Sequence, residues 1–162
     1  MTQFYFKKIL TPVGELRLAA HDHALVAVAW ENSLPYFMKD RMLIQQDEHE
    51  ILCLAEKQLN EYFLKQRQVF ELPIQPFGTE FQRSVWSALS SIPFGESRTY
   101  KQIAEQIGNV KAVRAVGLAN GKNPIAIIVP CHRVIGANGK LVGFAGGLEN
   151  KQKLLQLEDC KW

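Results

Sequence analysis

The residues best suited to carry out chemistry are three consecutive ones, Cys131, His132 and Arg133. A thiolate is a strong nucleophile, and positive charge or a base beside a thiol favours its formation. The tripeptide follows Ile125–Val129, a continuous apolar run that indicates a buried strand. Neighbours in an extended segment point to opposite sides, so we expect His132 to act on the sulfur through a bridging water. An acid that orients His132 must come from elsewhere, and Glu158 is a candidate.

The other cysteines do not form a recognisable metal or disulfide pattern. Cys53, Cys131 and Cys160 are odd in number and far apart in the sequence, which argues against a disulfide framework and a Cys-x-x-Cys site. A reducing compartment fits this usage. His21 and His23 lie in an expected turn, where we interpret them as exposed side chains rather than metal ligands. An isolated cysteine is often only a small buried hydrophobic residue, so Cys131 needs further support.

Charge is unevenly distributed along the chain, although the formal net charge is only +3. Residues 1–77 hold 8 Lys and Arg against 10 Asp and Glu, whereas residues 78–162 hold 11 against 6. A basic block of this kind favours a polyanionic partner, and the alternative is an ordinary solvated charged surface. The block contains Arg98, Lys101, Lys111, Arg114, Lys122, Arg133 and Lys140, with Glu105 as its one acid.

Periodicity and turn residues predict two halves of different character. In residues 4–30, short apolar runs alternate with turn residues, which indicates β-hairpins. In residues 47–63 the apolar spacing becomes helical. Residues 65–78 contain two prolines and a glycine in a polar setting, which predicts a boundary between domains at 1–77 and 78–162.

Two short helices in the second half are expected to be joined by a tight turn at Gly108-Asn109. Such a pair predicts a helix-turn-helix, in which the second helix faces the DNA. The expected helices are one capped by Thr79, one capped by Ser97 or Thr99, one over 111–120 with Lys111, Arg114 and Lys122 in or just after it, and an amphipathic one over 150–158.

The sequence around the cysteine, Pro130-Cys131-His132-Arg133-Val134-Ile135-Gly136, resembles the signature of the O6-alkylguanine-DNA alkyltransferases. The resemblance covers most of residues 78–158 in the expected order, whereas residues 1–77 are similar only in general character. It implies an α/β protein with a small N-terminal α+β, RNase H-like domain and a mostly helical, winged-helix-like C-terminal domain with a helix-turn-helix. The further matching segments are Gly78-Thr79-x-Phe81-Gln82-x-x-Val85-Trp86, Tyr100-x-x-Ile103-Ala104, Arg114-Ala115-Val116-Gly117, Asn123-Pro124 and Gly143-Phe144-Ala145-Gly146-Gly147.

The resemblance implies direct-reversal DNA repair by a protein-cysteine S-methyltransferase that works once. Cys131 corresponds to the acceptor of the alkyl group of O6-alkylguanine, and of O4-alkylthymine. His132 and Glu158 correspond to a water-linked relay that makes the thiolate. Tyr100 corresponds to the tyrosine that donates to the flipped base as its oxygen leaves. A base inside a duplex does not expose its O6-alkyl group to an attacking thiol, so the nucleotide must be flipped out.

The resemblance also assigns residues to DNA and to the pocket. Arg114 corresponds to the arginine that fills the space of the extruded base, and Asn123 to the asparagine that braces the turn before Cys131. Three positions depart from the family pattern: Leu118 stands where a small residue is usual, Ala145 offers only a backbone contact, and Glu80 stands where proline is common. The further DNA-binding residues are Lys111, Ala115, Lys122 and Arg133, and the pocket residues are Val134, Phe144, Ala145 and Gly146.

We expect no cofactor and no metal, a monomer, and double-stranded DNA containing O6-alkylguanine as the partner. The first ten residues carry no long apolar run and no stretch approaches a membrane helix, which predicts a cytoplasmic protein without membrane contact. Two other functions remain open from the residues alone. One is a Cys-His hydrolase that turns over, and the other is a non-catalytic lesion sensor or regulator.

Overall fold

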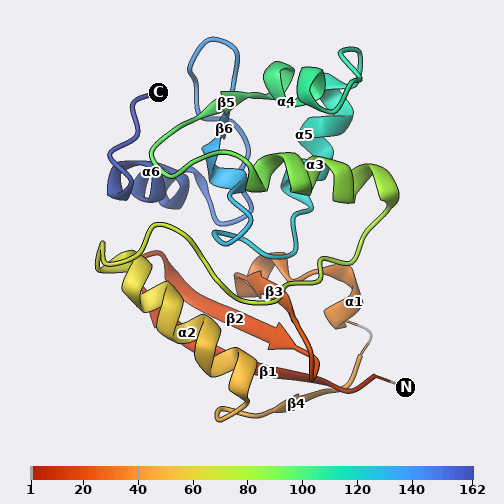
Figure 1. The fold of residues 1–162 in the computed structure, drawn as a ribbon, viewed down its shortest axis with the longest axis vertical. Coiled ribbons are helices and arrows are strands. Elements are labelled where there is room, and N and C mark those ends of the chain that lie inside the picture. The colour runs from red at the N-terminus through yellow and green to blue at the C-terminus, as the bar shows by residue number, and fades with distance from the viewer. Residues whose placement is uncertain (1, 40) are drawn as a thin grey trace.

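The computed structural model describes residues 2–39 and 41–162 and divides into a sheet-containing part and a helical part (Figure 1). The N-terminal half forms a four-stranded sheet covered by one long helix. The C-terminal half packs short helices above one edge of that sheet. This arrangement confirms the expected mixed α/β class, with an α+β part followed by a mostly helical part.

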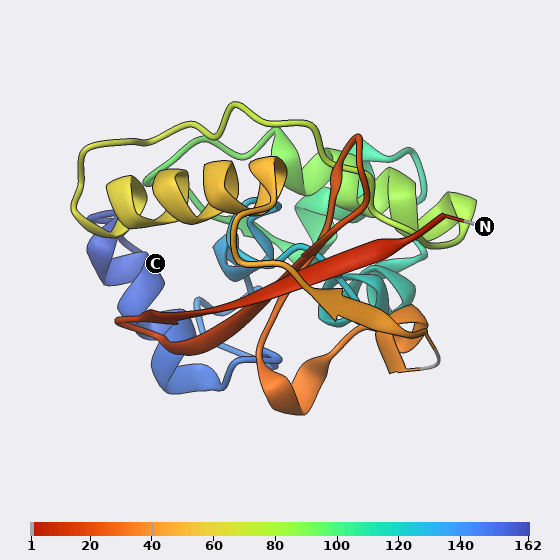
Figure 2. The same ribbon diagram turned by 90° about the horizontal axis from the view of Figure 1, so that it is seen from below.

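The N-terminal sheet has the strand order β3-β2-β1-β4. The first three strands are joined as antiparallel hairpins, as the sequence predicts, and β4 pairs with β1 in parallel. Helix α2 lies across one face of this sheet (Figure 2). The elements are β1 (Phe4–Thr11), β2 (Gly14–Ala20), β3 (Leu25–Ala29), a 3₁₀ helix η1 (Glu31–Ser33), α1 (Tyr36–Lys39), β4 (Leu43–Gln45) and α2 (Glu50–Phe63).

Helix α2 forms because its apolar residues recur at helical spacing and bury one face against the sheet. His49 caps its N-terminus, since the imidazole Nδ1 accepts a hydrogen bond from the backbone N–H of Ile51 at 3.3 Å. The buried face is made of Ile51, Leu52, Ala55, Gln58, Leu59 and Tyr62.

Strand β3 ends the sheet on one side, and two later segments cover that edge. The linker pairs with it near Leu25, whose backbone N–H donates to Pro73 at 2.9 Å. Farther along, the N–H of Val28 donates to Pro124, and the N–H of Ala126 donates back to Val28, both at 2.9 Å. An exposed edge strand would leave unpaired backbone groups, so this pairing both satisfies β3 and joins the two halves.

The continuous buried strand expected over 125–129 is wrong. Ile125 and Ala126 make isolated bridges, and the chain then turns so that the N–H of Val129 donates to Ile125 at 3.0 Å. Ile127 has a φ of 72°, which is a costly conformation for a β-branched residue. The apolar character of the run reflects a buried turn between the two halves, and periodicity alone does not distinguish such a turn from a strand.

The C-terminal half follows the predicted order of helices. Thr79 and Thr99 both act as N-caps in capping boxes, with Gln82 and Gln102 as their partners. Helices α4 and α5 pack together, and Gly108 adopts a φ of 78° in the turn between them. The elements are α3 (Glu80–Ser90), β5 (Arg98–Thr99), α4 (Tyr100–Gln106), α5 (Val113–Gly121), η2 (Cys131–Arg133), β6 (Val134–Ile135) and α6 (Leu148–Leu157).

The expected exposure of the two turn histidines is half wrong. His23 is exposed, but His21 is buried and its Nε2 lies 2.6 Å from the Oε1 of Gln75 in the linker. The turn therefore docks against the linker, which the local pattern does not reveal. Within the described ranges, no helix has the length and apolar content that spanning a membrane requires.

Gly78 provides a test of the packing at the start of the helical half. A Cβ at this position would lie 2.4 Å from the buried ring of Trp86, whose Nε1 donates to Ala119 at 2.8 Å. We expect Gly78→Ala to lower the free energy of unfolding by about 1–3 kcal/mol, because the ring must move. Urea denaturation measures this change. Gly121→Ala is the matched control, since nothing lies within 4 Å of its Cβ position, and equal destabilisation of both variants would contradict the prediction.

Candidate active site and DNA-binding surface

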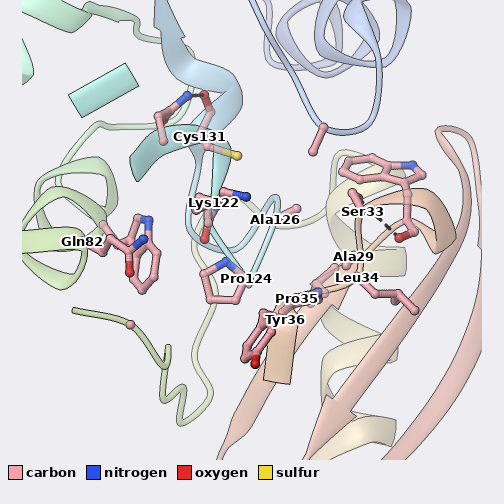
Figure 3. Close-up of a pocket in the computed structure, with 18 of the residues that line it drawn as sticks. Ala29, Ser33, Leu34, Pro35, Tyr36, Gln82, Lys122, Pro124, Ala126 and Cys131 are labelled. Atoms are coloured by element: carbon pink, nitrogen blue, oxygen red, sulfur yellow. Dashed lines mark hydrogen bonds between the residues drawn. The ribbon is translucent and has the colours of Figure 1, made fainter. Parts of the chain in front are cut away.

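Cys131 lies at the start of the 3₁₀ turn η2 and borders a cavity between the two halves of the protein. Cys131 is 6% exposed, and the cavity has a volume of about 610 Å³. In Figure 3 the sulfur points into the space between its own segment and the Ser33–Tyr36 segment of the N-terminal half. The nucleophile is therefore enclosed but has access to a space large enough for a base.

The backbone around Cys131 is not extended, so the geometry expected for the tripeptide is wrong. Residues 131–133 form a 3₁₀ turn because the apolar segment before them already reverses direction. Asn123 braces this reversal from within: its Nδ2 donates to the carbonyl of Val129 at 2.7 Å, and its Oδ1 accepts from the N–H of Ile125 at 3.0 Å. The predicted bracing geometry of Asn123 is thus present.

The carboxylate of Glu158 accepts hydrogen bonds from several polar groups behind the turn. The Nε2 of His132 lies 2.7 Å from Oε2, and the Nε of Arg133 donates to Oε1 at 2.8 Å. The hydroxyl of Tyr62, from α2 of the N-terminal half, donates to Oε2 at 2.6 Å. The backbone N–H of Gly95 also donates to Oε1, at 3.2 Å. A buried carboxylate requires such partners, and it receives them from three separate segments.

These contacts set the charge states of the cluster. Burial alone would raise the pKa of Glu158, but the hydrogen bonds from His132 and Arg133 and the positive charge of Arg133 outweigh it and lower the value to about 2. Burial lowers the pKa of His132 despite the nearby carboxylate. A neutral His132 must then donate its Nε2–H to Glu158, which leaves Nδ1 as an acceptor. That Nδ1 is buried and has no hydrogen-bond partner among the described residues.

Arg133 does not fit the expected DNA contact. Its guanidinium faces inward, where it pairs with Glu158 and donates from Nη1 to the carbonyl of Ile92 at 2.6 Å. Only 6% of the residue is exposed. A phosphate contact would break these bonds and leave the Glu158 carboxylate short of a partner. We therefore assign Arg133 an internal electrostatic role in place of the predicted one.

The positive charge that favours the Cys131 thiolate comes from Lys151 rather than from Arg133. Burial raises the pKa of the Cys131 thiol, while the hydrogen bond of Asn123 and the positive charge of Lys151 oppose this shift. Burial also lowers the pKa of Lys151, to about 8, so the ammonium is still largely charged at neutral pH. Its Nζ donates to the carbonyls of Val134 at 2.6 Å and Val142 at 3.0 Å. The predicted electropositive setting is present, with a different cation.

Tyr100 begins helix α4 on the same side of the molecule. Its hydroxyl donates to the carbonyl of Val142 at 3.3 Å, so it shares this acceptor with Lys151. Burial, and then the negative charge of a Cys131 thiolate, raise the pKa of Tyr100. The phenol therefore stays protonated at neutral pH and can act as a donor.

The predicted pocket residues lie on one loop and one short strand. Phe144 and Ala145 line the cavity together with Cys131, as does Asn123. Val134 is buried in β6, where its carbonyl holds Lys151. The carbonyl of Gly146 accepts from Nδ2 of Asn150 at 2.8 Å. Hydrogen bonds from α6 therefore fix the loop on the far side of the cavity from Cys131.

Helix α5 presents the predicted DNA-binding residues to solvent. Arg114 and Ala115 are exposed in its first turns, Lys111 is exposed just before it, and Lys122 is exposed at its C-terminal cap. Leu118 is 73% exposed on the same helix. An exposed helix with flanking cations matches the recognition element of a helix-turn-helix.

Two contributors to the site were missed from the sequence. Lys151 was overlooked although its spacing from Leu154, Leu155 and Glu158 places all four on the buried face of α6, so helical periodicity could have identified it. The cavity wall from the N-terminal half had no sequence signal. This wall contains Val28, Ala29, Trp30, Asn32, Ser33, Leu34, Pro35, Tyr36, Phe37 and Lys39. Across residues 2–39 and 41–162, no three His, Cys, Asp or Glu side chains gather as a metal site.

Acid unfolding tests the Glu158 cluster. A carboxylate whose pKa falls from 4.5 to about 2 on folding contributes roughly 3 kcal/mol, present above pH 4.5 and lost as the pH falls toward 2. We expect Glu158→Gln to remove this part of the pH dependence and to lower stability near pH 7, because Arg133 is left without its carboxylate. Urea denaturation between pH 3 and 7 measures both effects.

The control for this experiment is Glu149→Gln, which removes an exposed carboxylate from the same helix. It should leave the acid profile almost unchanged. An acid profile of Glu158→Gln that parallels the profile of the unmodified protein would contradict the assignment.

The chain is similar to known proteins over both of its halves. Residues 80–160 match the model of the 6-O-methylguanine DNA methyltransferase DNA binding domain, and residues 4–76 match the ribonuclease-like domain of the same family. A methylated-DNA–protein-cysteine methyltransferase of Methanosarcina mazei is 63% identical over 160 residues, which cover 96% of this chain and 97% of the relative. A relative with the same name from Methanosarcina acetivorans is 49% identical over 95% of this chain and 97% of its own.

Solved structures agree over nearly the whole chain. The crystal structure of a Mycobacterium tuberculosis O6-methylguanine methyltransferase superimposes with a TM-score of 0.88 at 44% identity, covering 97% of this chain and 93% of the other. A structure of the Mycobacterium tuberculosis OGT in complex with DNA has a TM-score of 0.87 at 45% identity, with 96% and 92% covered. The chain therefore belongs to the 6-O-methylguanine DNA methyltransferase family.

Proposed function

We propose that this protein repairs DNA directly, by moving the alkyl group of O6-alkylguanine, and of O4-alkylthymine, to its own Cys131. The observation that carries the proposal is a buried thiol that opens onto a base-sized cavity and is backed by an oriented histidine. The names of the relatives support the same reaction, and the structure of a relative with DNA supports duplex DNA as partner.

The thiolate is made by a relay rather than by a low pKa of the thiol. Burial disfavours the charged form of Cys131, so a base must take the proton. The free Nδ1 of His132 is the acceptor, reached through a bridging water, and Glu158 stabilises the imidazolium that results. Lys151 stabilises the negative sulfur.

The transfer itself is a displacement at the alkyl carbon. The Cys131 sulfur forms the S–C bond while the C–O bond to guanine breaks. The electron pair of that bond goes to the base, and Tyr100 transfers its hydroxyl proton to the base, which therefore leaves as a neutral molecule. The phenolate of Tyr100 then recovers a proton from water. The product is a thioether, which has no easy reverse reaction, so each molecule acts once.

The helix-turn-helix brings the lesion to the cavity. Helix α5 contacts the duplex through Lys111, Ala115 and Lys122, and phosphate neutralisation makes the binding salt-dependent. Arg114 enters the duplex and occupies the space of the extruded base. Flipping costs a few kcal/mol, which these contacts offset. Asn123, Phe144 and Ala145, which line the cavity, then hold the flipped base opposite Cys131. Val134 is fully buried and supports the site through its carbonyl, which accepts from Lys151.

The two alternative functions account for less of the site. A Cys-His hydrolase would turn over and would leave the exposed cations of α5 unexplained. A lesion sensor would need no nucleophile, whereas Cys131 has a relay and a charge partner. We further propose that residues 1–77 and 78–162 are two domains of a protein that acts as a monomer without a cofactor.

The acceptor assignment is tested by substituting each cysteine. We expect Cys131→Ser to bind a duplex that contains O6-methylguanine but to transfer nothing, because the hydroxyl is a far weaker nucleophile than a thiolate. Cys53→Ser and Cys160→Ser are the matched controls and should each gain one methyl. Intact mass and peptide mapping are the measurements, and a methyl mapped to Cys53 or Cys160 in the unmodified protein would refute the proposal.

The role of Arg114 is tested by comparing two substrates. We expect Arg114→Ala to slow transfer from duplex DNA by roughly tenfold or more, since base extrusion loses its support. Transfer from free O6-benzylguanine should change little, because a free base needs no flipping. Lys57→Ala removes an exposed cation from α2 and serves as the control. Equal slowing of Arg114→Ala on both substrates would overturn the role.

A further inference from the structure

Trp30 links the N-terminal half to the loop that closes the acceptor cavity. It follows β3 directly, it is 7% exposed, and its ring lies 5.4 Å from that of Phe144 in an edge-on arrangement. A Cβ on Gly146 would lie 2.6 Å from the Trp30 ring. The ring therefore lies directly against the backbone of the loop, and no side chain fits between them.

Hydrogen bonds fix both sides of this contact. The indole Nε1 of Trp30 donates to the carbonyl of Val13, in the turn between β1 and β2, at 2.8 Å. The amide of Asn150 donates to the same carbonyl at 3.0 Å and to the carbonyl of Gly146 at 2.8 Å. Val13 thus accepts one bond from each half, and a shift of the loop at Gly146 would break its bond to Asn150 or, if Asn150 moved with it, the bond of Asn150 to Val13.

The segment that carries Cys131 is held by hydrogen bonds to strand β3, which Trp30 directly follows. Val28 exchanges hydrogen bonds with the segment that leads to Cys131, accepting from Ala126 at 2.9 Å. Trp30 stands two residues farther along and meets the Gly146 backbone. Val28, Trp30, Cys131 and Phe144 all line the cavity. One short stretch of the N-terminal half therefore touches both the nucleophile's segment and the facing loop.

We propose that Trp30 is a positioning residue for alkyl transfer, holding the 143–147 loop at the working distance from Cys131. The inference rests on the proposed role of Cys131 and of this loop, and it gives the N-terminal half a part in the reaction. In this proposal Trp30 contacts the loop, and Cys131 forms the bond to the alkyl group. Small displacements in a site can cost on the order of a hundredfold in rate, so the fit of this ring matters.

A compensating pair of substitutions tests the proposal. Gly146→Ala should slow transfer from an O6-methylguanine duplex by on the order of tenfold to a hundredfold, because the new methyl group pushes the loop away from Trp30. Trp30→Leu should also slow it, because the loop loses its support. The double variant should be at least about threefold faster than Gly146→Ala alone, because the smaller leucine makes room for the methyl group. Single-turnover kinetics with intact mass as the endpoint measures each rate.

Controls separate positioning from simple loss of stability. Leu52→Ala empties a buried position in α2, and at temperatures well below its melting point it should transfer at the rate of the unmodified protein. If Trp30→Leu does not fold, Trp30→Phe replaces it in the same cycle, since it removes the bond to Val13 but keeps a ring. Wild-type rates for the folded Trp30 variant, or additive losses in the double variant, would overturn the inference. Failure of the Cys131 assignment would instead appear in the unmodified protein, as a methyl on another cysteine.

Discussion

The buried carboxylate of Glu158 is the constraint on which the rest of the site depends. A carboxylate away from water is tolerated only when its lone pairs are satisfied, and here the partners come from α2, from the segment after α3 and from both residues that follow Cys131. Satisfying one charge therefore fixes the direction of the chain at the nucleophile. It also turns the imidazole of His132 so that its second nitrogen remains free. The packing of the site and the proposed relay thus depend on the same side chain.

The burial of Cys131 creates a conflict that the surrounding groups resolve. Removing a thiol from water raises its pKa, which opposes the reactive form. A surface cysteine with a low pKa would be more reactive, but it would also react with other electrophiles and oxidants. Burial keeps the thiol in its protonated form, while Lys151 and the oriented His132 stand ready to support the thiolate when a substrate is present. The electrostatics of the site therefore favour selectivity over intrinsic reactivity.

The sequence predicts the helices and their caps because each leaves a local signal, whereas the relay through His132 and Glu158 is assigned only by the resemblance to the alkyltransferases. Thr79 and Thr99 are followed three residues later by glutamine, and the Cys131 motif is contiguous. What it misses depends on contacts between distant segments. The apolar run 125–129 gives the same signal whether it pairs as a strand or turns against β3, and the inward course of Arg133 follows from Glu158. The wall around Trp30 has no signal, because apolar residues after a strand ordinarily only fill a core.

The contacts that hold the walls of the cavity are compatible with the kind of reaction that it serves. An enzyme that turns over must release its product, and opening of a lid or loop often limits its rate. A protein that keeps the alkyl group on its own sulfur has no such step, so nothing requires the 143–147 loop to move after transfer. The loop is held by hydrogen bonds from Asn150 and Lys151 and by packing against the Trp30 ring, and the reaction does not require these contacts to break. The strained φ of Ile127 is tolerable for the same reason, because the turn before Cys131 needs only one conformation.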